Sequence, residues 1–231
     1  MRPSKVLELV DVYSSYGESD VLRGVNLEIG EGEIVALLGR NGMGKSTTVK
    51  SICGILNPHK GQIYFNGVNI DGMPSFKIAR MGVGLVPEGR RIFANLTVKE
   101  NLTGSSRKGY WDLSRILKLF PVFEERLSQM SSTLSGGEQQ MLAIGRALMT
   151  NPSLILLDEA TEGLSPVVSE TIWGVLGTIS NEGISILIVD KLSKNLQNLS
   201  NFGYIMERGT TTWSGNLSNI SGTVVRKLLG V

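Results

Sequence analysis

The stretch GRNGMGKST at residues 39–47 decides the fold of this chain. It follows the spacing G-x-x-x-x-G-K-[ST], in which glycines shape a loop that is followed by a lysine and a hydroxyl residue. A continuous apolar run at 33–39, EIVALLG, leads into it and predicts a fully buried strand. The residues after it predict a helix from about 45 to Leu56, ended by an Asn-Pro pair. A glycine-rich turn between a buried strand and a helix predicts a phosphate-binding loop.

This loop is suited to anions for two physical reasons. Its glycines let backbone N–H groups point inward, and the helix N-terminus adds a partial positive charge. Lys45 is predicted to reach the β- and γ-phosphates of a nucleotide, and the hydroxyl of Ser46 is predicted to ligate Mg²⁺. The candidate ATP-binding residues of the loop are Gly39, Arg40, Asn41, Gly42, Met43, Gly44, Lys45, Ser46 and Thr47.

A pair of acids follows a second apolar run, SLILLDEA at 153–160. The run predicts a buried strand that ends at Asp158, which places this carboxylate at the edge of the sheet where the phosphate loop begins. There Asp158 is expected to hold Mg²⁺ through water. Glu159 comes next and is the predicted catalytic carboxylate, because it can orient or deprotonate an attacking water.

The periodicity of the remaining chain predicts an α/β fold. Buried strands alternate with helices in the second half, which favours a parallel sheet. Residues 94–130 are apolar at helical spacing and predict a helical insert. The other predicted elements are half-buried strands at 6–12, 24–30 and 61–67, helices at 136–150 and 165–180, and a third buried strand at 184–190.

Composition limits the classes of function. The chain has 231 residues, 41% hydrophobic and 19% charged, which is ordinary for a soluble globular protein. A net charge of +2 without a dense Lys/Arg block gives no case for a nucleic-acid partner. The single cysteine, Cys53, excludes a disulfide framework. No run approaches the ~18 apolar residues of a membrane helix, and the first ten residues lack a signal core.

A third motif, LSGGEQQ at 134–140, begins a predicted helix whose free N–H groups are further phosphate ligands. Because it lies between the phosphate loop and the Asp-Glu strand, it resembles the signature motif of ATP-binding cassette (ABC) proteins. The resemblance extends from the N-terminal strands to about Gly215. The signature residues, which would contact ATP on a partner chain, are Leu134, Ser135, Gly136, Gly137 and Glu138.

The resemblance implies a P-loop NTPase core, a mainly parallel sheet flanked by helices, with an N-terminal antiparallel β subdomain and an inserted helical subdomain. The chain would be one ABC ATPase domain, with its core at 1–93 and 131–231 and its helical subdomain at 94–130. In such proteins two cassettes meet head to tail, and each ATP lies between one phosphate loop and the other chain's signature. Each motif occurs once here, so a complete site needs a second chain, either a copy or a paralogue.

The resemblance also assigns residues outside the three motifs. Tyr16, six residues before Leu22, matches the aromatic residue that stacks on adenine. The segment EGLSP at 162–166 matches the loop that communicates across the dimer, although Asp is usual where Ser165 stands. Glu88 stands where a glutamine normally senses the γ-phosphate and Mg²⁺. It can still bind metal-bound water, but an ionised glutamate cannot donate a hydrogen bond.

Lys191 stands at the switch position, after the strand that follows the catalytic one, where a histidine is usual. The only histidine, His59, comes too early in the chain to take that role. Two interpretations remain: Lys191 occupies the switch site as a third catalytic residue, or it is a solvated lysine at the start of a helix. At the switch site it would sense the γ-phosphate without relaying protons, because an ammonium group only donates hydrogen bonds.

A narrower resemblance concerns PEGRRIFANLTVKENL at 87–102 and VVRKLLGV at 224–231. Both resemble the smaller ATP-binding subunit of bacterial branched-chain amino acid importers, which has close relatives in urea and amide importers. This implies a cytoplasmic ATPase that uses ATP and Mg²⁺ on the inner face of the cell membrane. Two permease subunits would dock at 94–130 and near Glu88, and a periplasmic solute-binding protein would act indirectly.

Two rival classes are a non-transport ABC protein acting on nucleic acid and a nucleotide-gated clamp that does not hydrolyse ATP. The absence of fused cassettes, long inserts and basic tracts speaks against the first, so no nucleic-acid partner is expected. The intact Lys45, Asp158 and Glu159 speak against the second.

Overall fold

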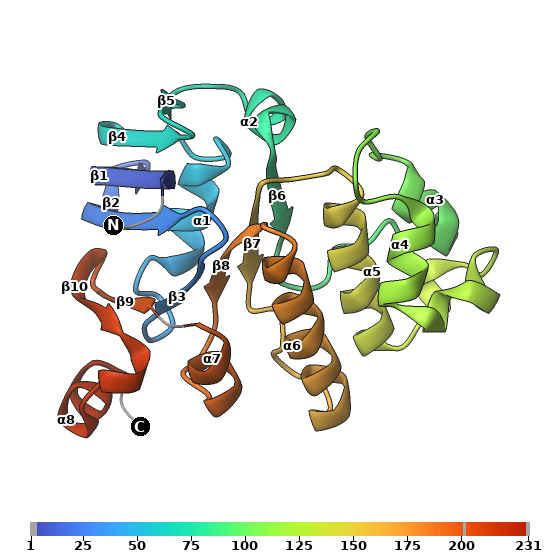
Figure 1. Ribbon diagram of the computed structural model, residues 1–231. Helices are drawn as coiled ribbons and strands as arrows, with labels where there is room; N and C mark the ends of the chain where they lie inside the picture. Colours follow the sequence, from blue (N-terminus) through green and yellow to red (C-terminus); the bar gives the residue numbers. More distant parts are fainter. Residues whose placement is uncertain (1–3, 201, 230–231) are drawn as a thin grey trace.

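The computed structural model describes residues 4–200 and 202–229, and its strands form two separate sheets (Figure 1). The four-stranded sheet lies at the upper left of the view, and helices α3 and α4 lie at the opposite end beside α5. The larger sheet runs between these two ends.

The central sheet has six strands in the spatial order β10-β9-β3-β8-β7-β6. Neighbours are parallel from β9 to β6, and only β10 runs antiparallel to its neighbour. β3, β7 and β8 are buried along their whole length, as their continuous apolar sequences predict. The strands are β3 (Ile34–Leu38), β6 (Val83–Val86), β7 (Leu154–Asp158), β8 (Ser185–Val189), β9 (Phe202–Glu207) and β10 (Thr210–Asn216).

The smaller sheet is antiparallel, with the order β2-β1-β4-β5. Its long strands show the alternation of buried and exposed residues expected for a sheet with one face on a core. The strands are β1 (Lys5–Tyr16), β2 (Ser19–Gly30), β4 (Lys60–Phe65) and β5 (Val68–Asn69).

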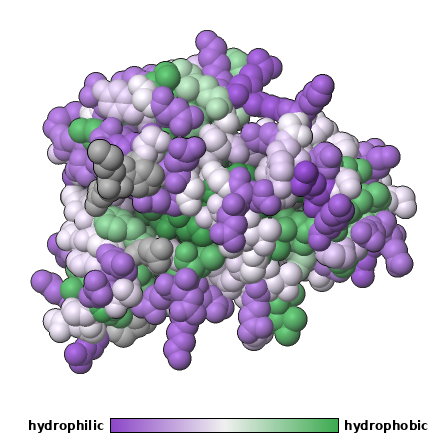
Figure 2. All heavy atoms as spheres, viewed as in Figure 1, coloured by the Kyte–Doolittle hydropathy of each residue, from purple (hydrophilic) through white to green (hydrophobic). Residues whose placement is uncertain are grey.

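The central sheet separates two apolar cores. Ala36 and Leu38 of β3 face the core that α5 and α6 cover, whereas Val35 and Leu37 face the core shared with α1 and the antiparallel sheet. In the view of Figure 2, hydrophobic atoms gather in a band across the middle and hydrophilic side chains project around the rim. The helices are α1 (Lys45–Ile52), α2 (Ser75–Met81), α3 (Val98–Thr103), α4 (Leu113–Leu119), α5 (Gly136–Leu148), α6 (Pro166–Asn181), α7 (Lys194–Leu199) and α8 (Gly222–Val224).

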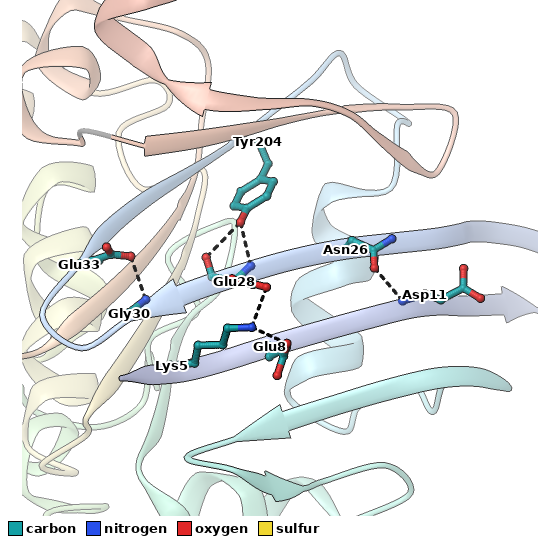
Figure 3. A network of polar contacts seen from close by, with 8 residues as sticks. All are labelled: Lys5, Glu8, Asp11, Asn26, Glu28, Gly30, Glu33 and Tyr204. Carbon is teal, nitrogen blue, oxygen red and sulfur yellow. Dashed lines mark hydrogen bonds and ion pairs between the residues drawn. The ribbon is translucent and has the colours of Figure 1, made fainter. Parts of the chain in front are cut away.

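A polar network joins the two sheets (Figure 3). The hydroxyl of Tyr204 on β9 accepts a hydrogen bond from the N–H of Glu28 on β2 at 2.9 Å and donates to the Glu28 carbonyl at 3.3 Å. The carboxylate of Glu28 pairs with Lys5 on β1 at 2.7 Å, and Lys5 also pairs with Glu8 at 2.6 Å. The network fixes the small sheet against β9, the neighbour of the strand that leads into the phosphate loop.

The structure corrects the predicted end of the first helix. α1 ends at Ile52 rather than at Leu56, because Gly54 adopts a left-handed backbone with φ +63° that terminates the helix. The N–H groups of Ile55 and Leu56 turn back to the carbonyl of Lys50, so the chain leaves the helix in a tight turn.

Residues 94–130 are less continuously helical than their sequence suggests. α3 and α4 are short and separate, and the apolar pattern after α4 continues as a 3₁₀ turn at Pro121–Arg126. Proline lacks the N–H that would continue α4, so the break falls at Pro121.

The sequence did not predict α2, β9 or β10. The C-terminal resemblance covers 224–231, of which 230–231 lie outside the described residues. Among the described residues no helix is long and apolar enough to cross a bilayer.

Candidate functional site

The candidate site lies where the carboxyl ends of β3, β7 and β8 meet. These strands are parallel neighbours in the order β3-β8-β7, so the loops that follow them converge at one edge of the sheet. The loops are the predicted phosphate loop, the segment after Asp158 and the segment after Val189. Three stretches that are far apart in sequence therefore contribute to one site.

The phosphate loop is held from inside by Lys45. Its ammonium donates to the carbonyl of Gly39 at 2.7 Å and to that of Arg40 at 3.1 Å, and the residue is only 7% exposed. Burial lowers the pKa of Lys45, and the nearby carboxylates of Glu159 and Asp158 oppose that shift. Gly44 is the N-cap residue of α1 and has φ +103°, and a side chain there would meet Leu22. Glycine is therefore required at this turn.

Ser46 and Asp158 form the candidate metal-binding pair. The Ser46 hydroxyl donates to Oδ1 of Asp158 at 3.2 Å, which links the start of α1 to the end of β7. Burial raises the pKa of Asp158, and the hydrogen bond from Ser46 acts in the opposite direction. Two adjacent hard oxygen ligands fit Mg²⁺, which is usually held by one or two protein groups plus nucleotide phosphates and water. Within the described residues no three acidic, histidine or cysteine side chains gather to hold a metal alone.

A hollow of ≈ 530 Å³ lies over the loop. The residues that line it include Tyr16, Lys45 and Ser46, together with the three acids Glu88, Glu159 and Glu162. Tyr16 ends β1 and is 47% exposed, with its hydroxyl accepting a hydrogen bond from Lys50 at 3.3 Å. An exposed aromatic ring at the rim of the hollow has the chemistry to stack on a nucleotide base.

Glu159 adopts a backbone conformation that is uncommon for a side-chain-bearing residue. Its φ is +53°, and its N–H donates to the carbonyl of Val189 on β8 at 2.8 Å. A hydrogen bond with the Glu162 carboxyl, followed by burial and the charges of nearby acids, raises the pKa of Glu159 to about 7. The pKa of Glu162 is lowered by the same hydrogen bond and by Lys191. A carboxylate that titrates near neutrality suits a general base.

Lys191 lies at the end of β8, but its ammonium pairs with a carboxylate. Its Nζ is 2.7 Å from Oε1 of Glu162, and the two side chains are 71% and 47% exposed. The preceding residue, the buried Asp190, accepts hydrogen bonds from the Thr161 hydroxyl at 2.8 Å and from the N–H of Lys191 at 2.7 Å. The two loops are thus joined by a partly buried hydrogen bond and an exposed ion pair. Sequence reasoning named Lys191 but missed this pairing.

The signature motif caps helix α5. The Ser135 hydroxyl accepts from the N–H of Glu138, whose carboxylate accepts from the N–H of Ser135 at 2.8 Å and pairs with Arg126 at 2.7 Å. None of the described signature residues belongs to the lining of the hollow over the phosphate loop. A single chain therefore does not bring its signature to its own phosphate loop.

The loop after β6 contacts both the hollow over the phosphate loop and the start of α5. Glu88 is exposed and lines both the main hollow and a smaller one of ≈ 250 Å³, which also contains Arg90 and Gln140. The guanidinium of Arg90 lies against Gly136, so a side chain at this position would displace it. Sequence reasoning singled out Glu88 but not Arg90, because its position depends on a left-handed backbone with φ +67°.

The fold and the site together define a P-loop nucleotide hydrolase: a phosphate loop between a buried strand and a helix, with a serine and an aspartate in contact beside a glutamate. The family model described as "ABC transporter" matches residues 22–162. The chain belongs to this family, whose members hydrolyse ATP, and it is the ATPase subunit of a transporter.

Several known proteins are similar over nearly their whole length. "High-affinity branched-chain amino acid transport ATP-binding protein BraG" of Pseudomonas aeruginosa is 40% identical, with 88% of this chain and 90% of that protein covered. "Probable branched-chain amino acid transport ATP-binding protein LivF" of Archaeoglobus fulgidus is 32% identical (93% and 94% covered). The "Lipopolysaccharide export system ATP-binding protein LptB" of Haemophilus influenzae is 33% identical (91% and 90%).

Two solved structures support the predicted fold class. The cassette MJ1267 in its ADP conformation superposes with a TM-score of 0.85 at 24% identity, covering 96% of this chain and 97% of that one. The dimeric post-hydrolysis state of the cassette MJ0796, bound to ADP and Pi, gives 0.80 at 27% identity, covering 93% and 100%. The predicted P-loop core with an antiparallel β subdomain is confirmed.

Proposed function

We propose that this subunit energises an importer of branched-chain or related hydrophobic amino acids. Two of the similar proteins carry branched-chain amino acid transport in their names, and one of them is 40% identical. The observation that carries the ATPase part is the phosphate loop, where the buried Lys45 and the hydrogen bond between Ser46 and Asp158 are already in place. The solute itself would be selected by other subunits.

In this proposal the residues of the site have separate roles in binding ATP and in hydrolysing it. Lys45 and the N–H groups of the phosphate loop bind the phosphates, and Tyr16 stacks on the base. Ser46 and Asp158 hold Mg²⁺, with Glu88 contributing through metal-bound water. Mg²⁺ when bound neutralises developing charge on the phosphates. Glu159 orients and deprotonates the attacking water.

A second cassette would complete the site. The signature residues lie outside the hollow of their own chain, and the solved MJ0796 cassette is a dimer bound to ADP and Pi. In the proposed dimer Ser135, Gly136 and Gly137 meet the nucleotide held by a partner cassette, either a copy or a paralogue.

Permease subunits would dock on a groove of ≈ 390 Å³ between the core and residues 94–130, which we propose as a helical subdomain. The groove is lined by apolar side chains, including Ile55 and Phe76, which are 57% and 55% exposed. Its charged lining residues, Arg107 and Arg146, are both cationic. A permease segment with apolar residues and a carboxylate would fit this lining. Docking there would hold the subunit on the inner, cytoplasmic face of the membrane, with a periplasmic binding protein delivering solute.

Uptake by intact cells tests the solute class. Deletion of the gene in its source organism should reduce uptake of labelled leucine, isoleucine and valine. The wild-type gene should restore uptake, Glu159→Gln should not, and the exposed Glu170→Gln should behave as wild type.

Two other outcomes would replace the proposed solute. Loss of urea or amide uptake alone would support the amide importer. A defect in envelope lipopolysaccharide with normal amino acid uptake would support an exporter, which the 33% identity to LptB makes a specific second candidate. Tight, salt-dependent binding of DNA or RNA by the purified chain would instead support the nucleic-acid class.

A further inference from the structure

Gln140 is a buried amide whose nitrogen is left without a hydrogen bond. It lies one turn after Gly136 on α5 and is 4% exposed, and its Nε2 has no partner among the described residues. An unpaired buried donor destabilises a fold, and most buried polar side-chain atoms in folded proteins are paired. An apolar side chain of similar size would avoid this penalty. The packing of α5 therefore gives no reason for an amide at this position.

The amide adjoins the proposed hydrolytic site. Gln140 lines the smaller hollow of ≈ 250 Å³ together with Glu88, Glu159 and Glu162, and the same three acids line the nucleotide hollow. The nitrogen and oxygen of an amide are nearly equal in size, so a half-turn about the last side-chain bond exchanges their positions. Gln140 can therefore present its N–H groups to the hollow without a change in packing.

The attacking water needs a hydrogen-bond donor as well as a base. Its proton goes to Glu159 while its oxygen bonds to the γ-phosphorus, so a second group must donate to that oxygen to fix its direction of attack. The acids Glu88 and Glu162 cannot do this, because an ionised carboxylate only accepts hydrogen bonds.

Two of the residues that line the smaller hollow carry side-chain donors, Gln140 and Arg90. The guanidinium of Arg90 lies against Gly136, the first residue of α5. The ammonium of Lys191, at the end of β8, is paired with a carboxylate. The amide of Gln140 is thus the neutral donor that is free to bind a water beside the base.

We infer that Gln140 is a further catalytic residue for ATP hydrolysis: its amide donates a hydrogen bond to the attacking water while Glu159 accepts the proton of that water. Helix α5 thereby supplies the amide donor that a glutamate at position 88 cannot provide. The inference deepens the proposed function and rests on the role of Glu159 as the base.

Gln140→Met separates catalysis from folding, because methionine has a similar length and is unbranched but has no N–H. The melting temperature should stay at the wild-type value or rise by about 2–4 °C, since an unpaired buried donor is removed. The kcat of the purified full chain should fall about 10- to 100-fold with an unchanged KM for ATP, because the water is held only for the chemical step. Gln140→Leu should behave in the same way.

The outcomes of this test are distinct. Gln62→Met, at an exposed glutamine on β4, is the matched control and should equal wild type in both measurements. A lower melting temperature for both Gln140 variants would show that the amide serves the fold, and a wild-type kcat would show that it does not hold the water. Either result overturns the inference. If Glu159→Gln hydrolyses ATP as fast as wild type, the proposed base fails instead.

Two double-mutant cycles identify the group on which Gln140 acts. In a Glu159→Gln background, Gln140→Met should lower the residual single-turnover rate no further, because both residues act on the same water. In a Glu88→Ala background the full loss should persist. Additive losses with Glu159→Gln would contradict a shared water. Disappearance of the loss with Glu88→Ala would show that Gln140 acts by holding Glu88, which also overturns the inference.

Discussion

The candidate nucleotide site has two groups of residues that differ in burial: a buried wall around Lys45 and Asp158, and an exposed wall around Glu162 and Lys191. On one wall, Lys45 and Asp158 are 7% and 6% exposed, and hydrogen bonds within the chain already hold both. On the other, the side chains of Lys191 and Glu162 are 71% and 47% exposed, and their ion pair is open to water and salt. The wall proposed to bind phosphate is preorganised, whereas the wall around the proposed base is solvated and adjustable. Affinity should therefore depend mainly on the first wall and turnover on the second.

The largest effect should come from the buried wall. Lys45→Ala removes a desolvated cation that holds the phosphate loop, and loss of such a charge costs about 100- to 1000-fold in ATP affinity. Hydrolysis should fall below detection. Titration with a fluorescent ATP analogue measures the affinity, and Lys99→Ala on α3 serves as an exposed-lysine control. Affinity within a few fold of wild type would show that the backbone of the loop binds the phosphates alone.

The next effect tests the separation of binding from turnover. Glu159→Gln keeps the size of the side chain but removes the base, so kcat should fall about 100- to 1000-fold while ATP affinity stays near that of wild type. Phosphate release and analogue binding measure the two quantities on the same sample. Equal phosphate release by wild type and the variant would contradict the role of Glu159, and a parallel loss of affinity would contradict the division between the walls.

The buried wall is also the part of the site that the sequence predicts. Lys45 and Ser46 are adjacent in one motif, and Asp158 ends an apolar run, so local spacing is enough to locate them. The alternation of buried strands and helices likewise predicts the central sheet. The neighbouring β9 and β10 were missed, because glycines at 203, 209 and 215 and a polar TTT run interrupt their apolar patterns.

The arrangement of the exposed wall could not be predicted from the sequence and was found only in the structure. Glu162 and Lys191 are 29 positions apart, and they meet because Thr161 and Asp190 join two segments that follow neighbouring strands. The left-handed backbone of Glu159 has no signal in the sequence, since a glutamate rarely adopts it. Sequence spacing therefore identified Lys191 as a position of interest without identifying its partner.

A smaller effect concerns the metal. Ser46→Ala removes the hydroxyl of the Ser46–Asp158 pair and leaves Asp158 in place. The Mg²⁺ concentration for half-maximal hydrolysis should rise about 10-fold, in the range found for altered metal sites. Titrating Mg²⁺ at saturating ATP measures it, with Ser106→Ala, an exposed serine far along the chain, as the control. An unchanged Mg²⁺ requirement would show that Asp158 and the nucleotide suffice.

The smallest expected effect is a shift in the pH dependence of kcat/KM when residues of the exposed wall are changed. The pKa of Glu159 is raised to about 7, first by its hydrogen bond with Glu162. Since the base must be ionised, kcat/KM of wild type should rise with pH through this value.

Glu162→Gln removes a negative charge beside Glu159, so the pKa of Glu159 falls and the midpoint should move to lower pH, whatever the change in maximal rate. Lys191→Ala removes a positive charge and should move the midpoint to higher pH. Any ionisation of ATP itself is the same for every variant and cancels in a comparison. The quantity to compare is therefore the difference in midpoint pH between each variant and wild type. Shifts in the same direction for both variants would show that the ion pair does not set the protonation of the base.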